Sequence, residues 1–260
     1  MESLQGAVAL VTGAATGIGK GIAVTLAQCG VMVGINHLPG QEEGAKDTLE
    51  RVRAAGSDGM VLEGDVRRRD EVLAMGETLR GQFGHVEIWV NNAAYQPNHR
   101  LLAYPADDVE RVLDTNLKGY LWGIQAAARI MRDRGYGRII NISSVHGKRP
   151  AGFDPVYAMS KGGIKMLVRE AAIELGRYGI TVNTIEPGAV HVGGKGNPHL
   201  VDTPPPLTNP DDLARRRLTF PLGRPGLAKD IGYLVVMLAR PESGFVNGAA
   251  IRADGGSMLL

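Results

Sequence analysis

The strongest constraint on the fold is that short runs of β-branched and aliphatic residues alternate along this chain with longer segments of helical periodicity. Seven segments have the length and composition of buried strands: residues 7–12, 31–36, 60–63, 86–91, 138–143, 181–186 and 249–252. Six helical patterns lie among them, at residues 17–29, 41–55, 70–82, 107–133, 157–177 and 229–239. Helices that join successive strands cross over right-handed and produce a parallel sheet. The pattern therefore predicts a doubly wound α/β fold, in which a seven-stranded parallel sheet carries helices on both faces.

One segment interrupts this alternation. Residues 192–210 contain five prolines and three glycines, so they cannot form a regular helix or strand. Because they follow the sixth expected strand, they lie near the carboxyl edge where open α/β sheets bind ligands. We expect an irregular substrate lid at about residues 190–220, with a passive surface loop as the alternative. No linker or repeat divides the remainder, so residues 1–260 are expected to form a single domain.

Composition and charge exclude several classes of protein. Lys and Arg number 29 against 27 Asp and Glu, so the net charge gives no reason to expect nucleic acid or a membrane surface as a partner. The single cysteine, Cys29, is typical of a reducing compartment. The first residues lack signal-peptide features and no long apolar run occurs, so a cytoplasmic protein is expected. The histidines show no metal-ligand spacing, and we expect no catalytic metal.

A glycine-rich turn links the first expected strand to the first helix. Gly13 permits the tight turn, Gly17 lets the backbone approach a phosphate, and Gly19 lets the helix pack closely on the strand. Free N–H groups at the start of the helix then face the pyrophosphate of a dinucleotide. We therefore expect Gly13, Thr16, Gly17, Ile18 and Gly19 to bind that group.

The end of the second strand, Asn36-His37-Leu38, indicates which ribose is bound. A carboxylate here would bind a ribose 2′-OH and an arginine would bind a 2′-phosphate, but neither is present, and His37 is at most a weak phosphate ligand. Nothing in this segment repels a phosphate, so we expect use of both NAD and NADP. Asp65, followed by Val66, ends the third strand and could accept a hydrogen bond from adenine; alternatively, it is a turn residue.

A serine, a tyrosine and a lysine follow the fifth expected strand and could together form a proton-accepting site. Ser144 follows the fifth strand, and Tyr157 and Lys161, four residues apart, share one helix face. A tyrosine pKa of about 10 makes a poor base, but a nearby ammonium and an oxidised nicotinamide would favour the phenolate. Ser144 would hold the reacting oxygen, and Asn116 could complete a proton path. Alone, a Tyr/Lys helix pair is usually a surface feature; together with the glycine turn it indicates dehydrogenation.

As a set, these motifs resemble the short-chain dehydrogenase/reductase family over residues 5–257. The resemblance is carried by the loop 12–19, Asn91-Asn92-Ala93, Asn116, Ser144, Tyr157-x-x-x-Lys161, Pro187-Gly188 and Asp254-Gly255-Gly256. It implies a Rossmann-like fold, a nicotinamide cofactor, a tetrad of Asn116, Ser144, Tyr157 and Lys161, and a homotetramer. It also implies that the cofactor contacts Tyr157, Lys161, Asn92, Ala93, Ala94, Pro187, Gly188 and Val190. Ala94 replaces the family's usual glycine, and Val192 replaces a threonine that often contacts the nicotinamide carboxamide.

Within the family, the segments 143–146 and 183–189 are most similar to bacterial glucose 1-dehydrogenases. This likeness implies oxidation of the anomeric hydroxyl of an aldose to the lactone. Basic residues near the expected pocket, His146, Arg149, His191 and Lys195, suggest an acidic sugar with a sulfonate, phosphate or carboxylate group; alternatively, they are solvated loop charges. The same tetrad could instead reduce a 3-oxoacyl thioester with NADPH. A non-catalytic dinucleotide-binding regulator is disfavoured, since Tyr157 and Lys161 are both present.

Overall fold

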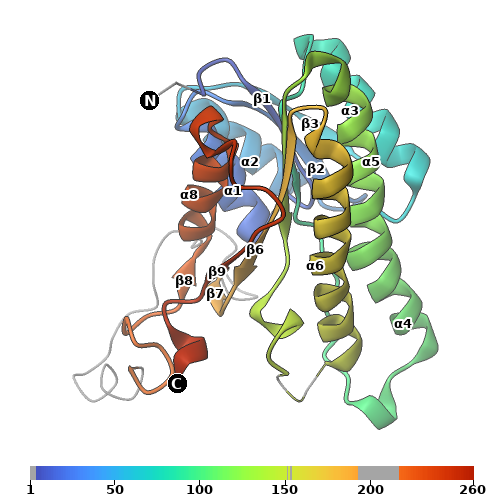
Figure 1. Ribbon diagram of the computed structural model, residues 1–260, viewed down its shortest axis with the longest axis vertical. Coiled ribbons are helices and arrows are strands. Elements are labelled where there is room, and N and C mark those ends of the chain that lie inside the picture. The colour runs from blue at the N-terminus through green and yellow to red at the C-terminus, as the bar shows by residue number, and fades with distance from the viewer. Residues whose placement is uncertain (1–3, 151, 153, 193–216) are drawn as a thin grey trace.

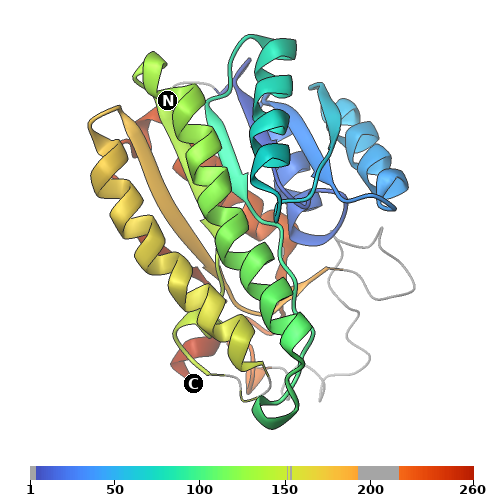
Figure 2. The same ribbon diagram turned by 90° about the vertical axis from the view of Figure 1, so that its right-hand side faces the viewer.

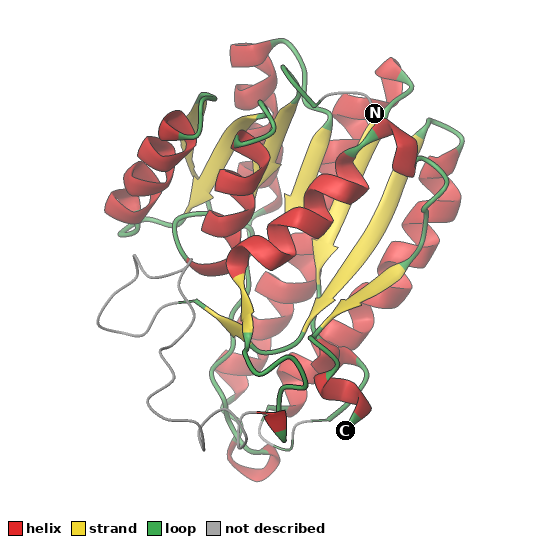
Figure 3. Cartoon of the chain, turned by 90° about the vertical axis from the view of Figure 1, so that its left-hand side faces the viewer, coloured by secondary structure: helices red, strands yellow, loops and turns green. Residues whose placement is uncertain are grey.

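Seven parallel strands form the central sheet of the computed structural model, which describes residues 4–150, 152, 154–192 and 217–260 (Figure 3). The strand order is β3-β2-β1-β4-β5-β6-β9. The strands are β1 (Val8–Val11), β2 (Met32–His37), β3 (Gly59–Glu63), β4 (Ile88–Asn91), β5 (Gly137–Ile142), β6 (Ile180–Pro187) and β9 (Ala250–Ala253). Two short strands, β7 (Val190–His191) and β8 (Gly226–Leu227), pair separately. The chain order reverses between β1 and β4, which opens a ligand crevice at the carboxyl edge of the sheet.

Helices cover both faces of the sheet (Figure 1). One face carries α1 (Gly17–Ala27), α2 (Glu42–Ala54) and α8 (Ala228–Ala239). The other carries α3 (Arg69–Phe83), α5 (Gly119–Met131) and α6 (Pro155–Gly176), and α4 (Ala106–Leu113) precedes α5 (Figure 2). Single 3₁₀ turns occur at Leu101–Ala103, Arg132–Arg134, Val145–Gly147, Pro241–Ser243 and Ser257–Leu259. The doubly wound α/β fold predicted from the sequence is confirmed.

The central strands are apolar throughout because both of their faces are buried. Alternate side chains of β1 enter opposite cores: Ala9 and Val11 pack toward α1 and α8, whereas Val8 and Leu10 pack toward α3 and α5. This two-residue period is that of a strand. None of the helices in the described ranges is long and apolar enough to cross a membrane.

The helix expected at residues 107–133 is present over residues 106–131, but it contains a π-helical turn that the periodicity did not predict. Helix α4 ends at Leu113, a π-helical turn occupies Asp114–Lys118, and α5 begins at Gly119. A π turn inserts one extra residue into the helix. It turns Asn116 inward, where the side-chain amide donates to the backbone oxygen of Tyr95 and to the hydroxyl of Ser160. Apolar periodicity does not reveal this insertion, because the apolar residues on either side of the turn still fit a helical pattern.

Two helical glycines give opposite predictions for the same substitution. A Cβ on Gly21 in α1 would lie 2.9 Å from the carbonyl carbon of Ala228 in α8, whereas a Cβ on Gly81 in α3 meets nothing within 4 Å. Gly21→Ala should therefore destabilise the protein by about 1–3 kcal/mol through overpacking. Gly81→Ala should stabilise it by about 0.5–1 kcal/mol through reduced chain entropy. Urea unfolding of both variants measures the difference, and a stabilised Gly21→Ala variant would contradict the close α1–α8 packing.

Candidate active site

The turn between β1 and α1 forms one wall of a cavity of about 470 Å³ at the carboxyl edge of the sheet. Gly13 and Gly17 have positive φ angles of 62° and 60°. A Cβ at Gly13 would lie 2.9 Å from Cα of Ala93, and one at Gly19 would lie 2.6 Å from Nδ2 of Asn92. At Gly17 a Cβ would make only an ordinary van der Waals contact with Val192, 3.7 Å away, so the positive φ angle is what favours glycine there. This cradle fits the phosphates of a dinucleotide.

Hydrogen bonds from neighbouring strands hold the cradle in place. Asn36 accepts from the Gly13 N–H at 3.1 Å and donates to the backbone oxygens of Leu62 and Gly64. Asn92 donates to the Thr12 and Gly13 carbonyls at 2.9 and 3.2 Å. The side chain of Asn36, expected to contact the cofactor, is therefore buried and occupied in supporting the turn.

Most residues expected to bind the cofactor line this cavity. They are Gly13, Thr16, Gly17, Ile18, Asn36, Leu38, Asp65, Val66, Asn92, Ala93 and Ala94. Gly19 lies behind the turn, while Pro187 ends β6 and Val190 begins β7. The Gly188 N–H donates to the Ala253 carbonyl at 3.0 Å, which fixes this segment against β9.

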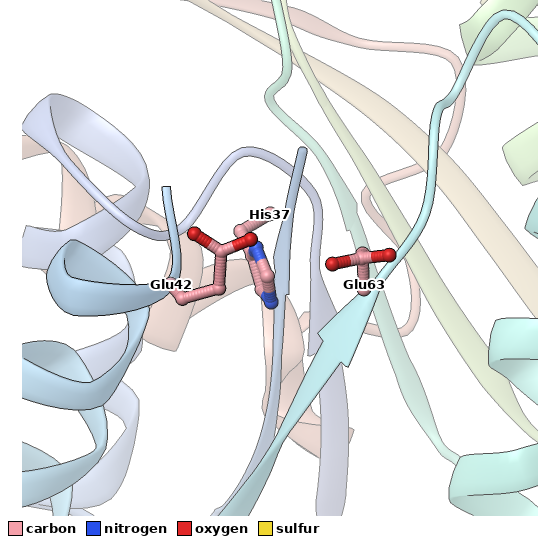
Figure 4. Close-up of side chains that lie close together, drawn as sticks. All are labelled: His37, Glu42 and Glu63. Atoms are coloured by element: carbon pink, nitrogen blue, oxygen red, sulfur yellow. The ribbon is translucent and has the colours of Figure 1, made fainter. Parts of the chain in front are cut away.

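Two carboxylates that the sequence analysis missed flank the buried His37 ring (Figure 4). Ligand atoms of His37, Glu42 and Glu63 all lie within 4.8 Å of one another. Donation from the Gly40 backbone N–H at 2.8 Å is the main reason that the pKa of Glu42 is lowered. These carboxylates lie beside the segment 36–38, on which the expected acceptance of a phosphate was based. Glu63 lies opposite His37 in the parallel register, which the sequence could not supply.

The expected adenine contact has a cationic neighbour. Asp65 accepts from the backbone N–H of Arg67 at 2.9 Å and from its Nε at 2.8 Å. Burial of the Asp65 carboxyl opposes ionisation, but these donors outweigh it and the pKa of Asp65 is lowered. Asp65 is therefore ionised, and it shares the cavity wall with Arg67 and Val66.

Ser144, Tyr157 and Lys161 come together where β5 meets the start of α6. The side chain of Ser144 lowers the pKa of Tyr157 through hydrogen bonding, and both residues line a second cavity of about 820 Å³. The Lys161 Nζ lies 5.6 Å from the centroid of the Tyr157 ring. The side chain of Asn116 bonds the Tyr95 backbone and the Ser160 hydroxyl and not the side chains of these three residues.

In the protein alone, burial opposes the acidification of the Tyr157 phenol that is expected from Lys161. Burial raises the pKa of Tyr157; the hydrogen bond from Ser144 lowers it and the charge of Asp154 raises it. Burial also lowers the pKa of Lys161 to about 7. The Lys161 ammonium donates to the Ile142 carbonyl at 2.9 Å and to the Tyr120 hydroxyl at 3.2 Å. The hydrogen bonds of Lys161 are therefore made to groups other than the Tyr157 phenol.

Asp154 is a further buried residue that the sequence analysis missed. Its carboxylate caps α6 by accepting from the Tyr157 N–H at 3.1 Å. It also accepts from the Asn98 N–H at 3.0 Å and from the Tyr104 hydroxyl at 2.9 Å. An Asp directly before Pro155 is a helix-start signal and could have revealed this cap.

The structure places two of the four basic residues expected near the substrate in the second cavity. His146 and Arg149 line the second cavity with Ser144 and Tyr157. His191 lies in β7 and is half-buried. Lys195 and most of the expected lid at about 190–220 lie outside the described residues.

Comparison with known proteins places this geometry among oxidoreductases. A family model described as Enoyl-(Acyl carrier protein) reductase matches residues 13–258. The chain is 36% identical to 3-oxoacyl-[acyl-carrier-protein] reductase FabG of Staphylococcus aureus, covering 96% of this chain and 98% of that protein. It is 34% identical to L-rhamnose 1-dehydrogenase (NAD(P)(+)) of a Sphingomonas species, covering 98% of each.

Solved structures show the same fold. Acetoin dehydrogenase YohF from Salmonella typhimurium superposes with a TM-score of 0.86 at 29% identity, covering 97% of this chain and 96% of that one. A putative gluconate dehydrogenase from Agrobacterium tumefaciens gives a TM-score of 0.86 at 33% identity, covering 99% and 98%.

Asp154→Asn should lower the pKa of Tyr157, because the charge of Asp154 is one of the groups that raise it. The rising limb of alcohol oxidation against pH should then move to lower pH. The neutral amide cannot replace every acceptor oxygen, so stability should fall by about 1–3 kcal/mol. The pH profile of kcat/KM measures the shift, with Asp108→Asn as a control, since Asp108 bonds Tyr95 and His99 instead. Superimposable profiles for Asp154→Asn and wild type would refute the electrostatic role.

Proposed function

The chain belongs to the short-chain dehydrogenase/reductase family, and from this premise we propose that it oxidises the anomeric hydroxyl of an aldose to the lactone. It is an oxidoreductase that acts on a CH–OH or carbonyl group. The observation that carries the proposal is that Ser144 and Tyr157 share one cavity with the polar Gln96 and Asn98 and the basic Arg149. Such a lining suits a hydroxyl-rich substrate, and the similarity to a rhamnose 1-dehydrogenase supports it.

A nicotinamide dinucleotide, when bound, supplies the hydride acceptor for this oxidation. The cradle around Gly17 would hold its pyrophosphate, Asp65 and Val66 its adenine, and Lys161 its nicotinamide ribose. Ala93, Pro187, Gly188 and Val190 would contact the remainder. The glycine positions that tolerate no Cβ fit this group.

The proton of the sugar hydroxyl would pass to Tyr157. Ser144 would donate a hydrogen bond to the reacting oxygen and hold it beside the phenol. Because burial raises the pKa of Tyr157, formation of the phenolate depends on positive charge from Lys161 and from the oxidised ring of the cofactor. Asn116 would act through the backbone of the π turn, since its side chain is bonded to Tyr95 and Ser160.

The nucleotide preference follows from the acidic pair beside His37. We propose that both NAD and NADP are accepted, and that NAD binds more tightly. A 2′-phosphate at the end of β2 would approach the carboxylates of Glu42 and Glu63, which surround the imidazole. Repulsion between like charges a few ångströms apart is about 1 kcal/mol in water.

Reduction of a 3-oxoacyl thioester is the second candidate, and the 36% identity to a 3-oxoacyl-[acyl-carrier-protein] reductase favours it. It uses the same Tyr157, with the proton moving from the phenol to the product alkoxide. An acidic sugar is a refinement of the first candidate. It rests on Arg149, which lines the catalytic cavity with an exposed side chain.

Other features remain predictions from the sequence. They are the specific likeness to glucose 1-dehydrogenases, the single-domain organisation of residues 1–260, the substrate lid, the homotetramer and the cytoplasmic location. A non-catalytic regulator remains disfavoured because Tyr157 and Lys161 are both present, with the Lys161 Nζ 5.6 Å from the Tyr157 ring centroid.

Activity on aldoses tests the proposed function. A panel of neutral aldoses, 6-phospho and 6-sulfo aldoses and an acetoacetyl thioester, each with both cofactors, should show fastest turnover on an aldose. Tyr157→Phe should lower kcat by at least about 10²-fold, because it removes the general base, yet bind the dinucleotide normally. Faster reduction of the thioester than oxidation of any aldose would select the second candidate. Equal turnover of neutral and 6-substituted aldoses would remove the acidic-sugar refinement.

Glu63→Gln tests the nucleotide preference. Removal of one carboxylate should raise the affinity for NADP relative to NAD by roughly fivefold, which corresponds to about 1 kcal/mol. Calorimetric titration of both nucleotides measures the ratio without any substrate. Glu43→Gln, an exposed neighbour outside the cluster, is the matched control. An unchanged ratio in Glu63→Gln would contradict the role of the acidic pair.

A further inference from the structure

A second tyrosine lies against the catalytic lysine. Tyr120, the second residue of α5, is almost fully buried. Its hydroxyl donates to the Ile142 carbonyl at 2.7 Å and accepts from the Lys161 Nζ at 3.2 Å. Lys161 also donates to Ile142 at 2.9 Å, so the three groups form a closed hydrogen-bonded triangle. The ammonium lies 5.0 Å from the Tyr120 ring centroid and 5.6 Å from that of Tyr157.

The surroundings of the Lys161 ammonium contain little that could compensate its charge. Within the described part of the chain, no carboxylate forms an ion pair with Lys161, and burial is the sole cause of its lowered pKa. The groups that face it are the phenol of Tyr120 from α5, the phenol of Tyr157 from α6 and the Ile142 carbonyl from β5. Asp154, whose charge raises the pKa of Tyr157, bonds Tyr104 and two backbone N–H groups instead.

We propose that Tyr120 is a positioning residue, whose hydroxyl is the neutral acceptor that keeps the Lys161 side chain charged and directed at the carboxyl end of β5. The inference rests on the proposed function, in which Lys161 acts on the cofactor ribose and on Tyr157. A buried ammonium loses several kcal/mol of hydration, and hydrogen bonds to it recover part of that loss. A phenylalanine would offer no oxygen, and an acidic residue would cancel the charge.

The chemistry of Tyr120 suits this role. Burial raises the pKa of Tyr120 well above its ordinary value, so the hydroxyl stays protonated and neutral at working pH. Because the Tyr120 hydroxyl donates its hydrogen bond to the Ile142 carbonyl, its lone pairs can accept from the Lys161 ammonium. Because the pKa of Lys161 is about 7, a small loss of stabilisation changes the charged fraction near neutrality strongly.

The backbone places Tyr120 close enough for this contact. The π turn at Asp114–Lys118 ends directly before α5. A Cβ on Gly119 would lie 3.2 Å from the Val66 carbonyl, and one on Gly123 would lie 2.8 Å from the Trp89 Nε1. These two glycines let α5 approach the ends of β3 and β4, and that approach brings the Tyr120 hydroxyl to β5.

The test is Tyr120→Phe, which removes the hydroxyl and keeps the ring. In the protein labelled with ¹³C at the lysine ε-carbon, the Lys161 resonance, assigned with Lys161→Met, should titrate at lower pH than in wild type. In the active enzyme, the rising limb of kcat/KM for alcohol oxidation should move to higher pH, because neutral Lys161 no longer favours the phenolate. At pH 7, kcat/KM should fall roughly tenfold, the loss of one hydrogen bond to a charged group.

Tyr136→Phe is the matched control, because it also removes a hydroxyl bonded to a backbone carbonyl, that of Ala239 at 3.2 Å. Both readouts should stay at wild-type values there. Tyr120→Gln supplies an acceptor oxygen without the ring, so its Lys161 pKa should lie between those of Tyr120→Phe and wild type. If Tyr120→Phe does not fold, the Lys161 titrations of Tyr120→Gln and Tyr120→Leu are compared instead, and Tyr120→Leu should titrate at the lower pH.

An unchanged Lys161 titration in Tyr120→Phe would overturn the inference, and so would a shifted titration that leaves the pH profile of an active enzyme unmoved. The NMR readout needs neither cofactor nor substrate. Failure of the proposed function would instead appear as inactivity of wild type on every compound of the panel, with the NMR result intact.

Discussion

The proposed chemistry depends on one constraint, a lysine ammonium buried at the end of β5 close to the rings of Tyr120 and Tyr157. Burial lowers the pKa of Lys161 to about 7 and raises the pKa of Tyr157, so the protein's own environment opposes both charged forms. In the proposed mechanism, the pair therefore becomes a working base only when further positive charge lies beside it. The glycine cradle at β1 and the cavity at the switch between β1 and β4 are where a dinucleotide would bring that charge.

The fold could be predicted from the sequence because strand and helix periods alternate without ambiguity. The seven strands recur at the expected places within a few residues, and β-branched runs such as β5 and β6 are buried on both faces. The glycine turn could also be predicted, because Gly13 and Gly19 occupy positions where a Cβ would clash. Within the described residues, helix-period reasoning missed the π turn that inserts one residue around Asn116.

The site was predicted less completely, because several of its groups depend on tertiary register. Glu63 reaches His37 only through the pairing of β2 with β3, and Tyr120 reaches Lys161 only because α5 packs closely on the sheet. The acidifying effect expected of Lys161 ignored the burial that both side chains share. Sequence spacing predicts which residues share a helix face, but it does not predict how deeply their side chains are buried and therefore how far burial shifts their pKa values.

The most direct measurement is the ionisation of Tyr157 with and without oxidised dinucleotide, followed as the ultraviolet difference spectrum of wild type minus Tyr157→Phe. A buried phenol that depends on added positive charge should ionise at clearly lower pH when NAD is bound than in the protein alone. If the phenol of Tyr157 ionises at the same pH in both states, the cofactor does not complete the base, and the central claim is wrong.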